Sequence, residues 1–254
     1  MGVYREAKIN QLLQLAQKGG LFFSSWLHDQ GYSPQLLMRY RKSGWLSALS
    51  KGVFYRKGES LSALGALASY QSQVSSDLYV AAHSALELWG FNHYVPMGKP
   101  VLMVGMRQRS VPLWLKSSLF DRDFRPFHSS ILQSVRLASF QYQDWLLQVS
   151  VPEQAFIECL YLAPKLYNYV DLFYIMEQLT VLRADVLQLL LEEAEHYRVR
   201  RLFLYMAEKA GHAWFDDLDV SRIDIGSHKH QLVKDGAYVA KYKMTIPKEL
   251  YNYE

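Results

Sequence analysis

The stretch that decides the fold is residues 33–57, SPQLLMRYRKSGWLSALSKGVFYRK. It opens with Ser33, a favoured helix N-cap residue, and with Pro34, which suits the first helical position because its missing N–H needs no partner there. An apolar stripe at three- and four-residue spacing follows, and it predicts a helix that ends at Gly44. The stripe consists of Leu36, Leu37 and Tyr40. The helix therefore has a defined start, a buried face and a defined end.

Two runs of strand character come directly after this helix, at residues 45–49 and 53–57, and Ser50-Lys51-Gly52 joins them as a tight hairpin. The other face of the helix is polar and basic. It carries Gln35, Arg39 and Lys42, with Met38 and Arg41 beside them. A helix with a basic face, followed by a basic hairpin, is typical of a winged helix-turn-helix, in which the helix enters the major groove of DNA and the hairpin lies along the backbone.

The segments before residue 33 complete this module in the order and spacing of a winged helix. They predict a helix at 4–18 that stops at Gly19-Gly20, a short strand or extended link at 21–22, and a helix at 25–30 capped by Ser24. Residues 60–73 predict a further helix that leads out of the module. We therefore place a winged helix-turn-helix DNA-binding domain at 1–76 and a second domain at 77–254.

The second domain is predicted to be mixed α/β, with a helical segment between β segments, so the whole chain belongs to the α+β class. Its middle is rich in strands, helical periodicity begins at Pro152, and strands return at the end with Asp235-Gly236 as a hairpin turn. The predicted strands are 78–82, 101–104, 124–131, 145–151, 231–233 and 238–246. The predicted helices are 83–89, 152–162, 169–177, 183–195 and 199–210.

Charge is unevenly distributed along the chain. Residues 1–60 contain nine Lys and Arg against three Asp and Glu, whereas the remaining residues contain nineteen against twenty-one. A basic first quarter on a near-neutral body is typical of a polyanion-binding module attached to another domain, with an ordinary solvated basic surface as the alternative.

Cysteine content and hydropathy limit the class of protein further. The single cysteine, Cys159, lies in an apolar helical pattern and leaves no internal disulfide or thiolate zinc site. No stretch has the length of a membrane span or the features of a signal peptide, so we expect a cytoplasmic protein with no membrane partner.

The candidate DNA contacts are side chains of the predicted helix and hairpin. Phosphate contact needs long cationic side chains on a rigid element, whereas Gln35 and Arg39 are candidates for base edges because Gln pairs with adenine and Arg with guanine. The full set is Gln35, Arg39, Arg41, Lys42, Lys51, Arg56 and Lys57. A second candidate basic surface consists of Arg198, Arg201 and Lys209, for which a solvated helix face is the alternative.

Enzymatic chemistry has weaker support. An acidic cluster precedes two histidines and resembles a metal site in composition, yet its first members lie in a predicted loop, and histidines two apart share a face only on a strand. The cluster comprises Asp216, Asp217, Asp219, Asp224, His228 and His230. No Walker A, HExxH or Gly-x-Ser-x-Gly pattern occurs. We therefore expect no catalytic residues, no metal and no cofactor. A nucleic-acid-targeted enzyme and a plain winged-helix regulator with a ligand-sensing C-terminal domain stay open as alternatives.

Several phrases along the chain carry a family resemblance. They are SGWLSALSKGVFY (43–55), YVAAHSALELWG (79–90), SVPEQAFIECLYL (150–162), VRRLFLYMAEKAGHAWFDDLD (199–219) and RIDIGSHKHQLVKDGAYVAKYKMTIP (222–247). In this order they resemble the AbiEi antitoxins of type IV toxin–antitoxin systems, and they cover most of the chain. Two places depart from the family's pattern: Gln154 stands where arginine is common, and His228 and His230 stand where a Gly-Lys-Arg run is common.

The resemblance implies a two-domain repressor and antitoxin. Its winged helix would bind inverted repeats in the promoter of its own operon, and its second domain would supply the antitoxin activity. The opponent would be a nucleotidyltransferase-like toxin from the adjoining gene, opposed without a stable complex, in abortive phage infection or maintenance of a mobile element. The resemblance fits a monomer or weak dimer that pairs on double-stranded DNA.

Overall fold

The computed structural model describes residues 3–15, 17–91, 98–107, 110–128 and 130–253, with side chains from residue 8 onward. The chain folds into two compact units that are discontinuous in sequence. The first comprises Met1–Val80, Pro96–His128 and Ala138–Val149, and the second comprises Ala81–Val95, Ser129–Leu137 and Ser150–Glu254. The predicted domain boundary after residue 76 stays a prediction.

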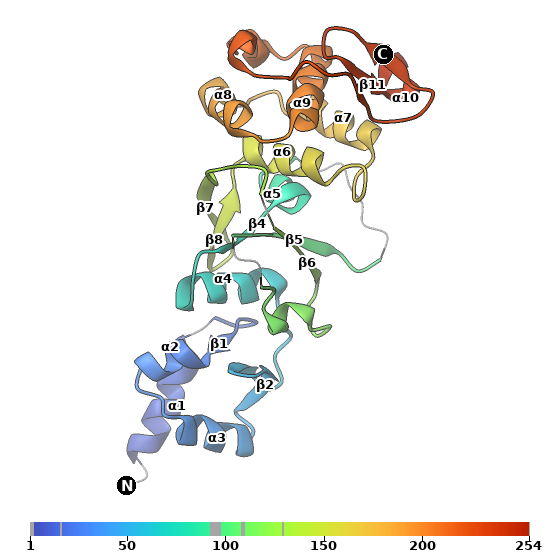
Figure 1. The fold of residues 1–254 in the computed structure, drawn as a ribbon. Coiled ribbons are helices and arrows are strands. Elements are labelled where there is room, and N and C mark those ends of the chain that lie inside the picture. The colour runs from blue at the N-terminus through green and yellow to red at the C-terminus, as the bar shows by residue number, and fades with distance from the viewer. Residues whose placement is uncertain (1–2, 16, 92–97, 108–109, 129, 254) are drawn as a thin grey trace. The chain divides into compact units, whose positions relative to one another are not determined.

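The first unit begins with the predicted winged helix (Figure 1). Its elements are α1 (Val3–Leu15), β1 (Phe22–Phe23), α2 (Ser24–Asp29), α3 (Pro34–Lys42), β2 (Leu46–Ser50) and β3 (Val53–Arg56). The three strands form an antiparallel sheet in the order β1-β3-β2. Apolar side chains from all three helices and all three strands make one core, which accounts for the stripe seen in the sequence. Its buried members are Ile9, Leu12, Phe22, Leu27, Tyr32, Leu37, Tyr40, Leu46 and Phe54.

A five-stranded mixed sheet forms the rest of the first unit. Its strands are β4 (Leu78–Val80), β5 (Val101–Met106), β6 (Asp123–His128), β7 (Leu137–Tyr142) and β8 (Trp145–Ser150), in the order β6-β5-β4-β8-β7. The 3-10 helix η1 (Leu113–Lys116) precedes β6. The sequence predicted four of these strands and missed β7.

The helix α4 (Ala63–Gln73) packs against β4 and carries a side chain that joins two strands. The amide of Gln71 donates to the carbonyls of Leu78 and Gln148, at 2.9 and 3.2 Å, and its oxygen accepts from the backbone N–H of Gln148 at 2.9 Å. Because β4 and β8 share a single register pair, Val80 with Val149, these bonds continue the pairing where the backbones diverge.

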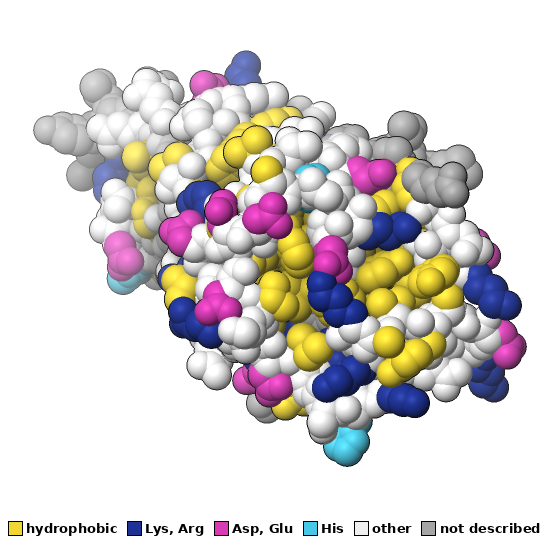
Figure 2. Space-filling model, turned by 90° about the horizontal axis from the view of Figure 1, so that it is seen from above, with side chains coloured by type: hydrophobic (Ala, Val, Ile, Leu, Met, Phe, Trp, Pro, Cys, Tyr) yellow, Lys and Arg dark blue, Asp and Glu magenta, His cyan; other side chains and the backbone are white. Residues whose placement is uncertain are grey.

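The second unit is mainly helical and ends in a small sheet. Its helices are α5 (Ala82–Leu88), α6 (Pro152–Leu162), α7 (Tyr169–Gln178), α8 (Ala184–Glu193), α9 (Tyr197–Ala210) and α10 (Lys248–Asn252), with the 3-10 helices η2 (Ala213–Phe215) and η3 (Val220–Arg222). The central helix is α9, which contacts α6 and α7 and is buried along most of its length. Figure 2 views the molecule from the side of α8, α9 and α10.

The closing sheet differs from the prediction. Its strands β9 (His230–Gln231), β10 (Ala237–Val239) and β11 (Met244–Ile246) lie in the order β10-β11-β9. The predicted strand 238–246 is therefore two antiparallel strands, and β9 runs parallel to β11. The predicted hairpin turn at Asp235-Gly236 is wrong. Gly236 serves close packing instead, because a Cβ there would lie 2.2 Å from the carbonyl oxygen of Ile246.

The phrase SVPEQAFIE builds a buried polar network at the start of α6. The carboxylate of Glu158 accepts from the backbone N–H of Ala82 at 2.8 Å, from the hydroxyl of Ser150 at 3.1 Å and from the amide of Gln154 at 2.8 Å. All three polar side chains are buried. Gln154 thus satisfies the buried carboxylate with a neutral amide.

In the part of the chain that the structure describes, no helix combines the length and apolar character needed to cross a membrane.

Candidate nucleic-acid interface

The exposed face of α3 is set by a cap and by its buried stripe. The hydroxyl of Ser33 accepts from the backbone N–H of Leu36 at 3.3 Å, and Pro34 occupies the first turn as predicted. Leu37 and Tyr40 turn into the core. The opposite face carries Gln35, Met38, Arg39 and Lys42, all of them exposed. Their spacing of three, four and seven residues places them on one side of the helix.

The tip of the hairpin presents Lys51 beside the start of α2. Gly52 adopts a left-handed φ of +75°, and its carbonyl accepts from the backbone N–H of Ser24 at 2.8 Å. Lys51 is exposed, as is Lys57 at the end of the second strand. The hairpin is therefore a short wing whose tip is fixed against α2, with its lysines free of the core.

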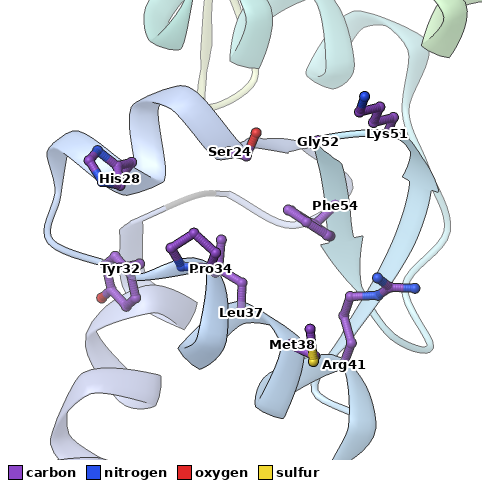
Figure 3. Close-up of a pocket in the computed structure, with 10 residues that line it drawn as sticks. All are labelled: Ser24, His28, Tyr32, Pro34, Leu37, Met38, Arg41, Lys51, Gly52 and Phe54. Atoms are coloured by element: carbon purple, nitrogen blue, oxygen red, sulfur yellow. The ribbon is translucent and has the colours of Figure 1, made fainter.

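A cavity of about 540 Å³ opens between α2, α3 and the wing tip (Figure 3). Pro34, Leu37 and Phe54 line it with apolar surface. His28, Arg41 and Lys51 also line it, one from each of the three elements, as Figure 3 shows. A second groove of about 570 Å³ between α3 and β2 is lined by Met38, Arg41 and Lys42 among others. Arg41 therefore lies between two hollows, off the outer face of α3.

His28 and Met38 belong to the candidate interface by position but were not among the predicted contacts. Met38 is 56% exposed on the same face as Arg39, although a methionine in a helix usually counts toward a core. His28 is exposed at the end of α2 and lines the same cavity as Arg41. The sequence signal for Met38 was its position three residues after Gln35; His28 became a candidate only through its position in space.

Arg56 is turned inward, unlike the other predicted contacts. Its guanidinium pairs with Glu59 at 3.1 Å and also donates to the carbonyl of Leu13, and its side chain is 16% exposed. The carbonyls at the end of α1 have no helical partner, so a cation there satisfies them and complements the helix dipole. Arg56 therefore joins α1 to the wing, and the structure removes it from the outward-facing set.

The second candidate basic surface is wrong in the same way. Arg201 is 2% exposed and donates to the carbonyls of Ile225, His228 and Lys243 at 2.6 to 2.9 Å. Arg198 donates to the carbonyls of Tyr161 and Ala163 at the end of α6, and Lys209 donates to that of Tyr251 at 3.2 Å. The three cations bind backbone oxygens of unit 2 and do not form a shared outward face.

Two members of the acidic cluster, Asp219 and Asp224, accept hydrogen bonds from residues two positions later in the chain. The carboxylate of Asp219 accepts from the hydroxyl and from the backbone N–H of Ser221, and that of Asp224 accepts from the backbone N–H of Gly226; these bonds lower the pKa of each carboxyl below its usual range. Among the residues that the structure describes, no three His, Cys, Asp or Glu side chains lie close enough to hold a metal ion.

Two protein-family models together match residues 5–247 of the chain. A family model described as "Transcriptional regulator, AbiEi antitoxin N-terminal domain" matches residues 5–97, and one described as "Transcriptional regulator, AbiEi antitoxin, Type IV TA system" matches residues 98–247. A search of curated protein sequences gave no match. Among solved structures, the chain resembles the crystal structure of the RV2827C protein from Mycobacterium tuberculosis, with a TM-score of 0.64 and 15% sequence identity over 96% of this chain and 91% of that one. At this identity the likeness concerns the fold alone.

Proposed function

The chain belongs to the AbiEi family of type IV toxin–antitoxin transcriptional regulators, and from this premise we propose that it represses its own operon by binding inverted repeats in the promoter through α3 and the wing. The observation that carries the proposal is the exposed face of α3. It bears a hydrogen-bonding side chain and two cations on one side of a capped helix, next to a wing with a lysine at its tip.

The residues divide into two roles under this proposal. Gln35 and Arg39, nearer the N-terminal end of the exposed face, contact base edges in the major groove. Arg41, Lys42, Lys51 and Lys57 contact phosphates and set the register of the helix on the duplex. Because each phosphate contact releases counterions, affinity should fall steeply as salt is added.

Two copies of the chain occupy the two halves of an inverted repeat. Each copy reads one half-site with its own α3, and half-sites one helical turn apart separate the two recognition helices by about 34 Å. We propose that the chain is a monomer or weak dimer in solution and pairs on the DNA. Sedimentation of the protein with and without the operator duplex tests this, and a stable dimer in the absence of DNA would overturn the pairing step.

The opponent in this system is a nucleotidyltransferase-like toxin encoded beside the chain. We propose that the antitoxin counters the effect of the toxin in the cytoplasm without forming a stable complex with it. Co-expression should restore growth, while size-exclusion chromatography of the two purified proteins should show separate peaks. Co-elution would contradict the proposal of action without a complex.

Footprinting and a reporter assay test the repressor role together. The wild-type chain should protect an inverted repeat upstream of its own operon and should lower expression of a reporter driven by that promoter. The Gln35→Ala plus Arg39→Ala variant should lose both effects, with Lys165→Ala, an exposed lysine of unit 2, as the control that keeps both. Protection of no site in the promoter would refute the repressor role.

A further inference from the structure

A cluster of exposed side chains at the closing sheet has no role in the proposed repressor. His228, Lys229 and His230 are consecutive and exposed at the start of β9. Tyr197, at the start of α9, is 48% exposed, and Tyr238, in β10, is 45% exposed. These five residues are called the Lys229 face below.

Contacts connect both tyrosines to the loop of residues 226–230. The ammonium of Lys229 lies 5.2 Å from the centre of the Tyr238 ring. At Gly226, where φ is +70°, a Cβ would lie 3.1 Å from the ring of Tyr197, and the guanidinium of Arg200 lies 5.7 Å from the centre of that ring. The loop that leads to His228 therefore packs against the ring, which is still 48% exposed. Arg201 lies beneath them: burial lowers the pKa of its guanidinium, and the nearby Tyr238, Asp224 and Tyr197 partly offset that shift.

The backbone under this face is anchored from inside. Arg201 donates to the carbonyls of Ile225, His228 and Lys243 at 2.6, 2.8 and 2.9 Å. His230 also donates its backbone N–H to the carbonyl of Lys243, at 2.9 Å. A buried arginine with three backbone acceptors holds an exposed loop in one conformation, which reduces the entropy that a ligand would have to remove on binding.

The charge of the neighbourhood is suited to an anionic partner. Lys243 adds a cation whose ammonium lies 3.2 Å from the carbonyl oxygen of Gly226. The acidic Asp224 also lies here: its carboxylate accepts the N–H of Gly226 at 2.8 Å and a hydrogen bond from Tyr197, and it lies near Arg200 and Arg201. A phosphate group of a ligand at this face would therefore contact lysine side chains. The carboxylate of Asp224 already accepts hydrogen bonds within the loop.

From this arrangement we propose that the Lys229 face binds a single strand of nucleic acid, with Tyr197 and Tyr238 stacking on bases and Lys229 contacting the phosphate backbone. Exposed aromatic rings beside cations are the means by which proteins hold single strands without reading sequence. A duplex does not suit this face, because its bases are stacked on one another and closed to the rings. The proposal goes beyond promoter binding and uses a different unit of the chain.

Fluorescence anisotropy with the full chain separates the two activities. The probes are a labelled 20-nucleotide uridine RNA, a labelled 20-nucleotide thymidine DNA and the labelled operator duplex. Replacing both tyrosines, Tyr197→Leu plus Tyr238→Leu, should weaken binding of the single strands by about tenfold or more, because the stacking contacts with two bases are lost. The Tyr197→Phe plus Tyr238→Phe variant keeps the rings and should bind as the wild type does. Lys229→Ala should weaken the single strands, whereas Lys116→Ala, an exposed lysine of unit 1, should not.

The α3 variant provides the reciprocal control. Arg39→Ala plus Lys42→Ala should lose the operator duplex and keep the single strands, and the Lys229-face variants should do the reverse. Binding of either single strand that the Lys229-face substitutions weaken supports the proposal. The probe that binds more tightly, RNA or DNA, identifies the preferred strand. Single-strand affinity that is unchanged in Tyr197→Leu plus Tyr238→Leu, or that disappears in the α3 variant, overturns it. Neither of these two results bears on the repressor role, which is tested by binding of the operator duplex.

Discussion

At the scale of single residues, substitution of Arg56 should change the stability of the fold without changing DNA binding. Its guanidinium joins Glu59 to the carbonyl of Leu13, at the end of α1. We predict that Arg56→Gln lowers the free energy of unfolding by about 1.5–3 kcal/mol, since hydrogen bonds to charged groups contribute about that much. Urea denaturation followed by circular dichroism measures it. The slope of DNA affinity against salt should stay that of the wild type, whereas Lys42→Ala should flatten it by about one phosphate contact. Wild-type stability with a flatter slope for Arg56→Gln would show that this arginine faces DNA after all.

Arg201 gives a second prediction at this scale. Its planar guanidinium reaches three carbonyls in fixed directions, which an ammonium on a flexible stem cannot match. We predict that Arg201→Lys, despite keeping the charge, lowers the free energy of unfolding by about 2–3 kcal/mol because buried acceptors lose their donors. The control is Arg222→Lys, whose exposed pair with Glu192 should matter by less than about 1 kcal/mol. Equal midpoints of thermal unfolding for the two variants would contradict this assignment.

The orientation of these two arginine side chains could not be predicted from the sequence, whereas the exposed face of α3 could. Helical spacing placed Gln35, Arg39 and Lys42 on the exposed side of α3, because the apolar stripe opposite them fixed the face. It could not show that the heads of Arg56 and Arg201 turn inward. Their acceptors are carbonyls 24 to 43 residues away in the chain, and every residue has a carbonyl, so no pattern marks the few that lack a partner.

At the scale of elements, the turn of the wing depends on the left-handed conformation of Gly52. Gly52 has a φ of +75°, and a Cβ there would lie 2.7 Å from the hydroxyl oxygen of Ser24. We predict that Gly52→Ala lowers the free energy of unfolding by about 1–2 kcal/mol, which is the cost of a left-handed conformation for a residue with a Cβ. Adding Ser24→Ala removes the close contact and should recover only the steric part. Stability equal to the wild type in Gly52→Ala, measured by urea denaturation, would show that the turn relaxes at no cost.

Element prediction succeeded where a local signal matched the fold. The helix α6 occupies the predicted residues 152–162, since Pro152 defines its start and its apolar period is regular. The segment 238–246 failed because its residues have strand character throughout, while the turn between β10 and β11 contains Lys243 at a φ of +49° rather than a glycine. Gly236, the apparent turn residue, was selected by close packing against Ile246.

Alkaline pH tests the buried interior at the scale of the whole molecule. Burial raises the pKa of the Cys159 thiol well above its usual range, and burial also raises the pKa of the Tyr167 hydroxyl. Both groups ionise in the unfolded chain before they do so in the folded one. The contribution of these two groups to stability should therefore be constant below about pH 8.5 and fall above it, by up to about 1.4 kcal/mol per pH unit for each group. Urea midpoints between pH 7 and 10 measure this.

The Cys159→Ala variant isolates the contribution of the thiol. Its stability should begin to fall only near pH 10, where tyrosines of the unfolded chain ionise. A decline between pH 8.5 and 9.5 as steep as that of the wild type would assign the effect to other groups. The variant is also expected to be less stable than the wild type at neutral pH, because it leaves a small cavity.

The division of the whole molecule into units was beyond the sequence. The order of elements and the α+β class followed from local patterns, and the phrases that carry the family resemblance lie along both units. The chain passes between the units several times, at residues 80–81 and 149–150 among others. A linear reading that looks for one linker cannot find these two crossings, because each lies within a run of strand and helix residues.

The most direct test of the central claim, that α3 and the wing hold the operator, is one titration. A labelled duplex from the promoter of the chain's own operon is titrated with the full chain in the presence of excess unrelated duplex, at several salt concentrations. The account predicts competitor-resistant binding that Arg39→Ala plus Lys42→Ala weakens at least about tenfold, with a flatter salt slope, while Lys229→Ala binds as the wild type does. Equal affinity of the wild type for promoter and unrelated duplex, or an α3 variant that binds the promoter as well as the wild type, would contradict it.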